Sequence, residues 1–165
     1  TGPSDAARLL HSSAGVSSLM DYASIDATDI GVERAFDVVA FKSVLGGVGG
    51  AGGREAQARA VQSMYTALRP GGLLLFAENL CASPLHKYLR RRFVRWGDRW
   101  RYVTADEMRY FFGPFSQVHD RSFGFAGAFG RSEKQRTALA GLDIAGLDRA
   151  VPPHWRYIIA GVATK

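Results

Sequence analysis

The chain has 165 residues, of which 47% are hydrophobic, 12% aromatic and 22% charged, and its net charge at pH 7 is +6. These values are typical of one soluble globular domain and exclude a disordered or collagen-like chain. The single cysteine, Cys81, excludes an internal disulfide framework, and no Cys and His cluster has metal-ligand spacing. No apolar run could span a membrane, and the first residues lack a secretory signal. We therefore expect a cytoplasmic protein without a metal.

The first half of the chain alternates helical patterns with short apolar segments. Helices are predicted over residues 4–13 and 54–69. Strands are predicted at residues 19–25, 36–41 and 73–77. The segment FDVVAF at 36–41 is compact and β-branched, which predicts a strand buried on both faces of a sheet.

A glycine run, Gly46 to Gly53, separates the second predicted strand from the helix after it and contains six glycines in eight residues. It favours a flexible connecting loop. Its Gly47 to Gly52 portion also satisfies G-x-G-x-x-G, and Glu78 ends the next strand, which is the outline of a dinucleotide-binding phosphate cradle. A mobile lid is the third interpretation.

The segment from Lys87 to Arg101 carries seven basic residues and one acidic residue, so it accounts for the whole net charge. Its apolar residues recur at helical spacing and predict a basic amphipathic helix. The apolar face, expected on the core, consists of Leu85, Leu89, Phe93 and Trp96. Four interpretations stay open: a solvated helix face, a cap whose arginines bind an anionic substrate, contact with an anionic membrane surface, and nucleic-acid binding.

The second half of the chain adds two helices and two strands. A capping box at Thr104 and Glu107 opens a helix that ends by Gly113, and Ser132 with Gln135 opens another, interrupted near Gly146. Strands are predicted at residues 115–125 and 157–163. Helices alternating with short apolar strands indicate an α/β sheet of mainly parallel strands in a single domain, 1–165.

Three segments in this order resemble the class I S-adenosylmethionine-dependent methyltransferases that act on small molecules and lipids. The matching segments are Asp26-Ala27 after a strand, Phe36-Asp37-Val38-Val39 with its exit Phe41-Lys42-Ser43, and Leu68-Arg69-Pro70-Gly71-Gly72 before Leu73-Leu74-Leu75-Phe76. The resemblance implies a Rossmann-like sheet and S-adenosylmethionine as cofactor. It implies cofactor-binding residues at Asp26, Ala27, Phe41, Lys42 and Ser43.

The acceptor is expected to be a small molecule or lipid-like compound. Residues 1–80 would form the second half of the cofactor-binding region, 81–130 the acceptor-shaping region and 131–165 the last helix and strand. Because ligands bind at the carboxyl ends of strands in such sheets, we expect substrate contacts from Glu78 and Asn79, and from the basic segment. The basic segment would contribute Arg91, Arg95 and Trp96, and His86 is the candidate base.

The chain also departs from the family. The glycine-rich loop after the family's first strand, and the acidic residue that binds the ribose, would both lie upstream of Ser4, so we expect a partial methyltransferase whose sheet is incomplete at its N-terminal end. The strand ending near Asp26 would then lack a neighbour. Two alternatives remain: a non-catalytic module that binds an anionic partner or membrane through residues 84–101, and a nicotinamide-dependent oxidoreductase that uses Gly47 to Gly52.

Overall fold

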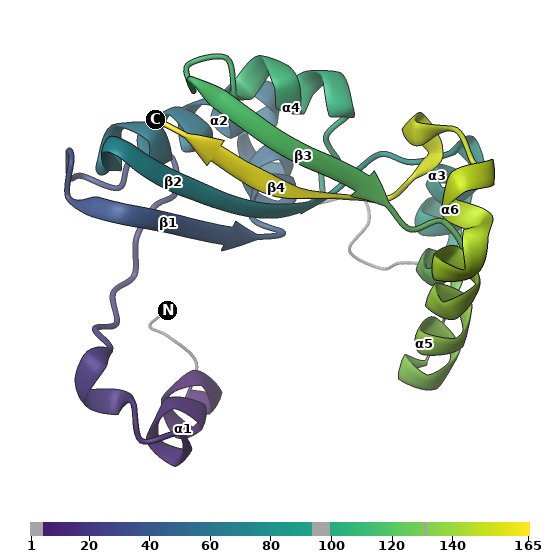
Figure 1. Cartoon of the computed structure of the whole chain (residues 1–165), viewed down its shortest axis with the longest axis horizontal. Coiled ribbons are helices and arrows are strands. Elements are labelled where there is room, and N and C mark those ends of the chain that lie inside the picture. The colour runs from purple at the N-terminus through teal and green to yellow at the C-terminus, as the bar shows by residue number, and fades with distance from the viewer. Residues whose placement is uncertain (1–4, 94–99, 131) are drawn as a thin grey trace.

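The computed structural model describes residues 5–93, 100–130 and 132–165 (Figure 1). The helices are α1 (Asp5–Ser13), α2 (Leu45–Ala67), α3 (Pro84–Phe93), α4 (Ala105–Phe111), α5 (Glu133–Leu142) and α6 (Asp148–Ala150). The strands are β1 (Phe36–Lys42), β2 (Leu68–Asn79), β3 (Gln117–Phe123) and β4 (Ile158–Thr164). Short helical turns lie at Ser17–Leu19, Ala126–Phe129, Asp143–Leu147 and Pro153–Trp155.

The four strands form one sheet in the order β1-β2-β4-β3. Strands β1 and β2 pair in parallel, whereas β4 pairs antiparallel to both β2 and β3. Three of the four strands therefore point the same way, and β4 is reversed between two of them. This arrangement confirms the predicted α/β sheet of mainly parallel strands.

One face of the sheet carries the core. Helices α2 and α4 lie on the same side of the sheet in Figure 1. Alternate residues of the central strands, such as Leu74, Phe76 and Ile159, are buried beneath them. The C-terminal Lys165 ties this layer together, because its Nζ donates to the carbonyls of Tyr65, Thr66 and Leu68 at the end of α2.

The opposite sheet face is open among the described residues. Val38 of β1 and Leu75 of β2 are 50% and 43% exposed, and Phe36 is also exposed. The prediction that 36–41 is buried on both faces is therefore wrong. β-branched composition signals a strand that can be buried, but burial also needs a covering layer, and Figure 1 shows no helix against this face.

The predicted strand at 19–25 is also absent. Leu19 ends a short helical turn, and residues 20–25 have no regular structure. Figure 1 shows α1 apart from the sheet, joined to it by this extended segment. A strand needs a partner for its backbone groups. The edge strand β1 is the strand nearest in sequence to residues 19–25, but among the described strands it pairs only with β2.

The glycine run is helical rather than a loop, so the loop prediction is wrong. Helix α2 begins at Leu45 and includes the run, with a kink at Gly53 where φ is 69°. Gly46 permits close packing, because a Cβ there would lie 1.8 Å from Nε1 of Trp100. A phosphate cradle would need these glycines in a loop before the helix, and the structure places them inside it.

This packing predicts a contrast between neighbouring glycines. Gly46→Ala should lower the free energy of unfolding by about 1–2 kcal/mol, because the indole of Trp100 must move away. Gly47→Ala is the matched control, since its Cβ would meet the nearest Trp100 atom at 3.5 Å, an ordinary contact, and alanine favours a helix. Urea unfolding of both variants measures the difference, and equal destabilisation would contradict the packing role of Gly46.

Helix α3 is rotated from its predicted orientation. Leu85 is predicted on the core and is 52% exposed, whereas His86 is buried and Arg90, which lies off the predicted apolar face, is half-buried. The apolar periodicity predicted the wrong inward face because polar residues anchor this helix.

The capping box at Thr104 and Glu107 is confirmed, with both reciprocal hydrogen bonds present.

Candidate functional site

The carboxyl ends of β1 and β2 bring polar side chains together. Lys42 is paired with Ala77, so both parallel strands end at the same edge of the sheet. The chain then turns at Ser43, which has a φ of 54°, and its amide donates to the Ala77 carbonyl at 2.9 Å. Asn79 Nδ2 donates to Ser43 Oγ at 2.9 Å. The predicted residues Lys42, Ser43 and Asn79 therefore share one edge.

The buried carboxylate of Glu78 holds the end of β2 in place. Its side chain is only 1% exposed, and its Oε2 accepts from the Leu45 amide at 2.8 Å while its Oε1 accepts from the Asn79 amide at 2.9 Å. Burial raises the pKa of the Glu78 carboxyl, and the backbone N–H groups at the start of α2 oppose this shift. Glu78 thus links the end of β2 to the first turn of α2.

A hollow of about 490 Å³ lies on the sheet beside this edge. It is lined mainly by apolar atoms of the three adjacent strands, with Lys42 at the strand exit, and its residues are Ala40, Phe41, Lys42, Leu75, Phe76, Ala77, Ala160 and Gly161. An apolar surface with a few polar groups at one end is the usual composition of a small-molecule site. The ring of Phe41 is directed into the core, where it stacks on Phe76.

Asp26 lies in a turn rather than at a strand end. Its Oδ1 accepts from the amide and the hydroxyl of Thr28, both at 2.8 Å. These hydrogen bonds lower the pKa of Asp26, and the Arg59 guanidinium of α2 lowers it further. Its neighbour Ala27 packs against the core. The structure thus leaves Asp26 an ionised, exposed acceptor beside α2.

His86 is held on both ring nitrogens. Its Nε2 lies 3.0 Å from the Phe125 carbonyl, which can only accept, so Nε2 carries the proton and Nδ1 accepts from Ser83 Oγ at 2.6 Å. The ring stacks on Phe129. Its role as a base remains a prediction, and it requires the Ser83 hydroxyl to leave Nδ1. In the present geometry His86 joins α3 to the loop after β3.

Burial lowers the pKa of His86 below its ordinary value of 6.5. The unfolded chain therefore binds more protons near and below that value, so stability should fall as pH decreases from about 7.5 to about 5.5. Thermal unfolding at both pH values should show a smaller decrease for His86→Gln than for wild type. His119→Gln, at an exposed position on β3, is the control. An undiminished decrease in His86→Gln would assign the pH effect to another group.

The remaining predicted substrate residues are described only in part. Arg95 and Trp96 lie outside the described residues, and so does the Arg91 side chain. Their neighbour Arg90 has a structural role, because it donates to the Leu80 carbonyl at 2.9 Å and lies 3.9 Å over the Tyr102 ring.

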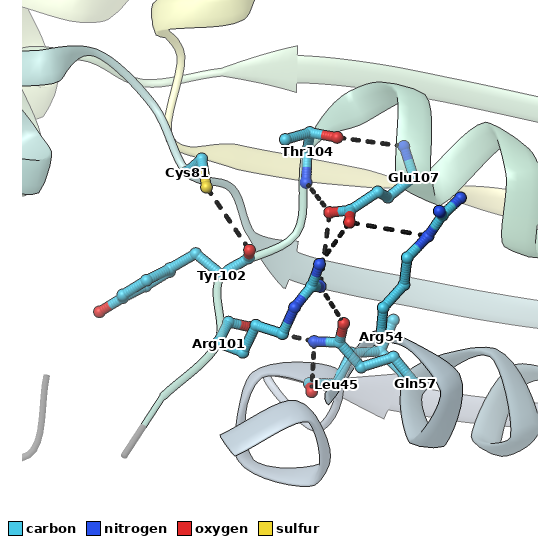
Figure 2. Close-up of polar contacts among 8 residues, drawn as sticks. All are labelled: Leu45, Arg54, Gln57, Cys81, Arg101, Tyr102, Thr104 and Glu107. Carbon is cyan, nitrogen blue, oxygen red and sulfur yellow. Dashed lines mark hydrogen bonds and ion pairs between the residues drawn. The ribbon is translucent and has the colours of Figure 1, made fainter. Parts of the chain in front are cut away.

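The structure adds a polar network that the sequence analysis missed (Figure 2). Gln57 of α2 is fully buried, and its Nε2 donates to the carbonyls of Leu45 and Arg101, each at 2.9 Å. The Arg101 guanidinium bonds Gln57 Oε1 and the Glu107 carboxylate. The network fastens residues 101–107 to α2 at Gln57, which also bonds the Leu45 carbonyl at the start of the helix. The capping box was the only sequence signal for any of its members.

No family model and no curated protein sequence matches this chain. Solved structures do match. SpnF, a [4+2]-cyclase, has a TM-score of 0.58 and 19% identity, covering 96% of this chain and 60% of its own. An S-adenosylmethionine-dependent methyltransferase from Archaeoglobus fulgidus has a TM-score of 0.53 and 10% identity, covering 81% and 61%. The N-methyltransferase NodS from Bradyrhizobium japonicum has a TM-score of 0.51 and 14% identity. The match covers 96% of this chain and 68% of NodS.

The fold is that of the S-adenosylmethionine-dependent methyltransferases. The chain spans about 60% of the length of SpnF and of the Archaeoglobus enzyme. Because one of these matches is a cyclase and two are methyltransferases, similarity of fold does not by itself identify the reaction. None of the described helices is both long and apolar enough to cross a bilayer.

Proposed function

We propose that this chain contributes to the transfer of a methyl group from S-adenosylmethionine to a small-molecule or lipid-like acceptor. The observation that carries the proposal is the shared edge of β1 and β2, where Lys42, Ser43 and Asn79 meet beside an apolar hollow. This edge belongs to a sheet with methyltransferase neighbours, and ligands of open α/β sheets bind at the carboxyl ends of strands.

The residues present suit parts of the cofactor. Lys42 offers a cation for a carboxylate, and Ser43 and Asn79 offer hydroxyl and amide groups for the polar methionine end. The lowered pKa of Asp26 keeps it an acceptor, which suits the adenine amino group implied by the family resemblance. When bound, the cofactor supplies an electrophilic methyl group on a sulfonium.

The chain's own residues would act mainly by placement. Glu78 and the Ser43–Asn79 hydrogen bond hold the strand ends in position, so the acceptor and the methyl group can be aligned in line. The apolar hollow would contact the apolar part of the acceptor. We propose that an upstream segment with a glycine-rich loop completes the cofactor site, in keeping with the greater length of SpnF and the Archaeoglobus enzyme.

Calorimetric titration of S-adenosylhomocysteine tests this proposal. The ligand is titrated into this chain and into a version extended upstream to its natural start. Binding to the extended form, with weaker or no binding to the present chain, supports a cofactor site completed from upstream. Binding to neither form overturns the proposal.

In the extended protein, Asp26→Ala should weaken S-adenosylhomocysteine binding, because the acceptor for the adenine amino group is lost. Asp37→Ala is the control, since its carboxylate pairs with Arg69 near the opposite end of β1. Calorimetry of both variants measures the effect. An unchanged affinity for Asp26→Ala would remove Asp26 from the cofactor site.

A further inference from the structure

Helix α3 is anchored along one face by two polar residues one turn apart. His86 bonds Ser83 and the Phe125 carbonyl, and Arg90 donates to the carbonyl of Leu80 and covers the Tyr102 ring. Burial lowers the pKa of both groups, in agreement with their inward positions. These contacts fix which face of the helix points outward.

The outward face of α3 carries large apolar side chains in water. Leu85 and Tyr88 are 52% and 64% exposed and lie three residues apart, so they are neighbours on the helix surface. Lys87 and Arg92 are exposed on the same helix. The helix sequence, PLHKYLRRRF, contains no acidic residue. Leu85, Tyr88 and Arg92 share this face and Lys87 flanks it, and we call these four residues the α3 surface.

Scattered apolar side chains on a protein surface are ordinary, but this surface combines them with two exposed cations on a helix without an acidic residue. Residues 87–101 carry the net charge of +6 in the sequence, but Arg90 and Arg101 are bonded inward, so Lys87 and Arg92 are the cations that the α3 surface offers. A leucine and a tyrosine beside basic side chains are suited to the boundary of an anionic bilayer, where the apolar groups enter and the cations meet lipid headgroups.

We propose that the α3 surface docks on anionic phospholipid membranes. Charge complementarity selects the partner, and the exposed Leu85 and Tyr88 favour a bilayer over a nucleic acid, since a phosphate backbone offers no apolar layer for leucine. The rest of the chain is electrically balanced, so it adds no net positive charge for binding a nucleic acid. The inference goes beyond the proposed methyl transfer and does not depend on it.

Vesicle cosedimentation tests the proposal with the whole chain. The probes are phosphatidylcholine vesicles with and without a quarter of phosphatidylserine, at about 0.1 M salt. We expect binding to the anionic vesicles only. Lys87→Glu should lower the partition coefficient at least about fivefold, the effect of removing one cation near the surface. Lys134→Glu, at an exposed position on α5, is the matched control and should leave binding unchanged.

The apolar contribution is tested with Leu85→Ser and Tyr88→Ser combined, against Ile144→Ser, whose side chain is also exposed. Circular dichroism verifies that each variant is folded. The double variant should lose vesicle binding, and Ile144→Ser should keep it.

Three outcomes would overturn the docking proposal. The first is equal binding to neutral and anionic vesicles. The second is binding that survives the double variant. The third is absence of binding to the anionic vesicles, and duplex DNA binding that Lys87→Glu weakens would then assign the α3 surface to a nucleic acid. Because no cofactor is used, failure here is distinct from failure of the calorimetric test for S-adenosylhomocysteine.

Discussion

Replacing Glu78 with leucine should lower the free energy of unfolding by about 2–5 kcal/mol. Leucine has a similar bulk but no acceptor, so the Leu45 and Asn79 amides would lose their partner in a buried place. Each unsatisfied buried donor costs about 1–3 kcal/mol. Urea unfolding followed by circular dichroism measures the loss. Glu133→Leu is the control, because Glu133 is exposed in the first turn of α5 and its replacement should change the free energy of unfolding very little.

A second variant separates hydrogen bonding from charge at the same position. Glu78→Gln keeps one side-chain acceptor, so its stability should lie between those of wild type and Glu78→Leu. Since the pKa of Glu78 is raised in the folded protein, the wild type should lose stability as pH rises from about 4.5 through the folded pKa. Glu78→Gln should lack this component. Wild-type stability in Glu78→Leu would show that Glu78 does not hold β2 to α2.

The sheet was largely predictable from local patterns. Apolar segments bounded by turn residues located β1 and β4 to within a few residues, because their hydrophobic signal is strong. Strand β3 lies within the predicted segment 115–125, although its residues are mainly polar and exposed. The capping box at Thr104 located α4, because its reciprocal hydrogen bonds are local in sequence. The strand ends followed from the same reasoning, and with them the positions of Ser43 and Asn79.

The failures have one physical origin, which is contact between residues far apart in the chain. The glycine run is helical and Gly46 in it packs against Trp100, a residue that no local rule connects with it. Leu85 faces solvent because the opposite face of α3 is anchored. His86 bonds the Phe125 carbonyl in the loop after β3, and Arg90 lies over the Tyr102 ring. The segment 19–25 is not a strand because no described strand pairs with it. Local patterns predict which elements can form, and long-range partners decide how they are placed.

The network around Arg101 illustrates such a long-range dependence and leads to the second large effect. Arg101→Ala should lower the free energy of unfolding by about 2–3 kcal/mol. The substitution removes the cation shared by Gln57 and Glu107 (Figure 2), and leaves a fully buried amide oxygen and a largely buried carboxylate. Removing one partner of a buried pair costs about 3–5 kcal/mol, and the partial exposure of Arg101 reduces this.

Arg54→Ala is the matched control, because Arg54 also faces Glu107 but at 3.8 Å and with an exposed side chain. Its loss should cost less than about 1 kcal/mol. A second readout separates the two variants. The Arg101 amide donates to the Gly46 carbonyl, so hydrogen exchange at residue 101 should accelerate when the side chain is removed, as residues 100–103 detach from α2. Equal effects of the two substitutions would show that residues 100–107 are held to α2 by Trp100 packing instead. The start of α2 therefore supports both segments, since the Leu45 amide donates to Glu78 at the strand edge and the Gly46 carbonyl accepts from the Arg101 amide.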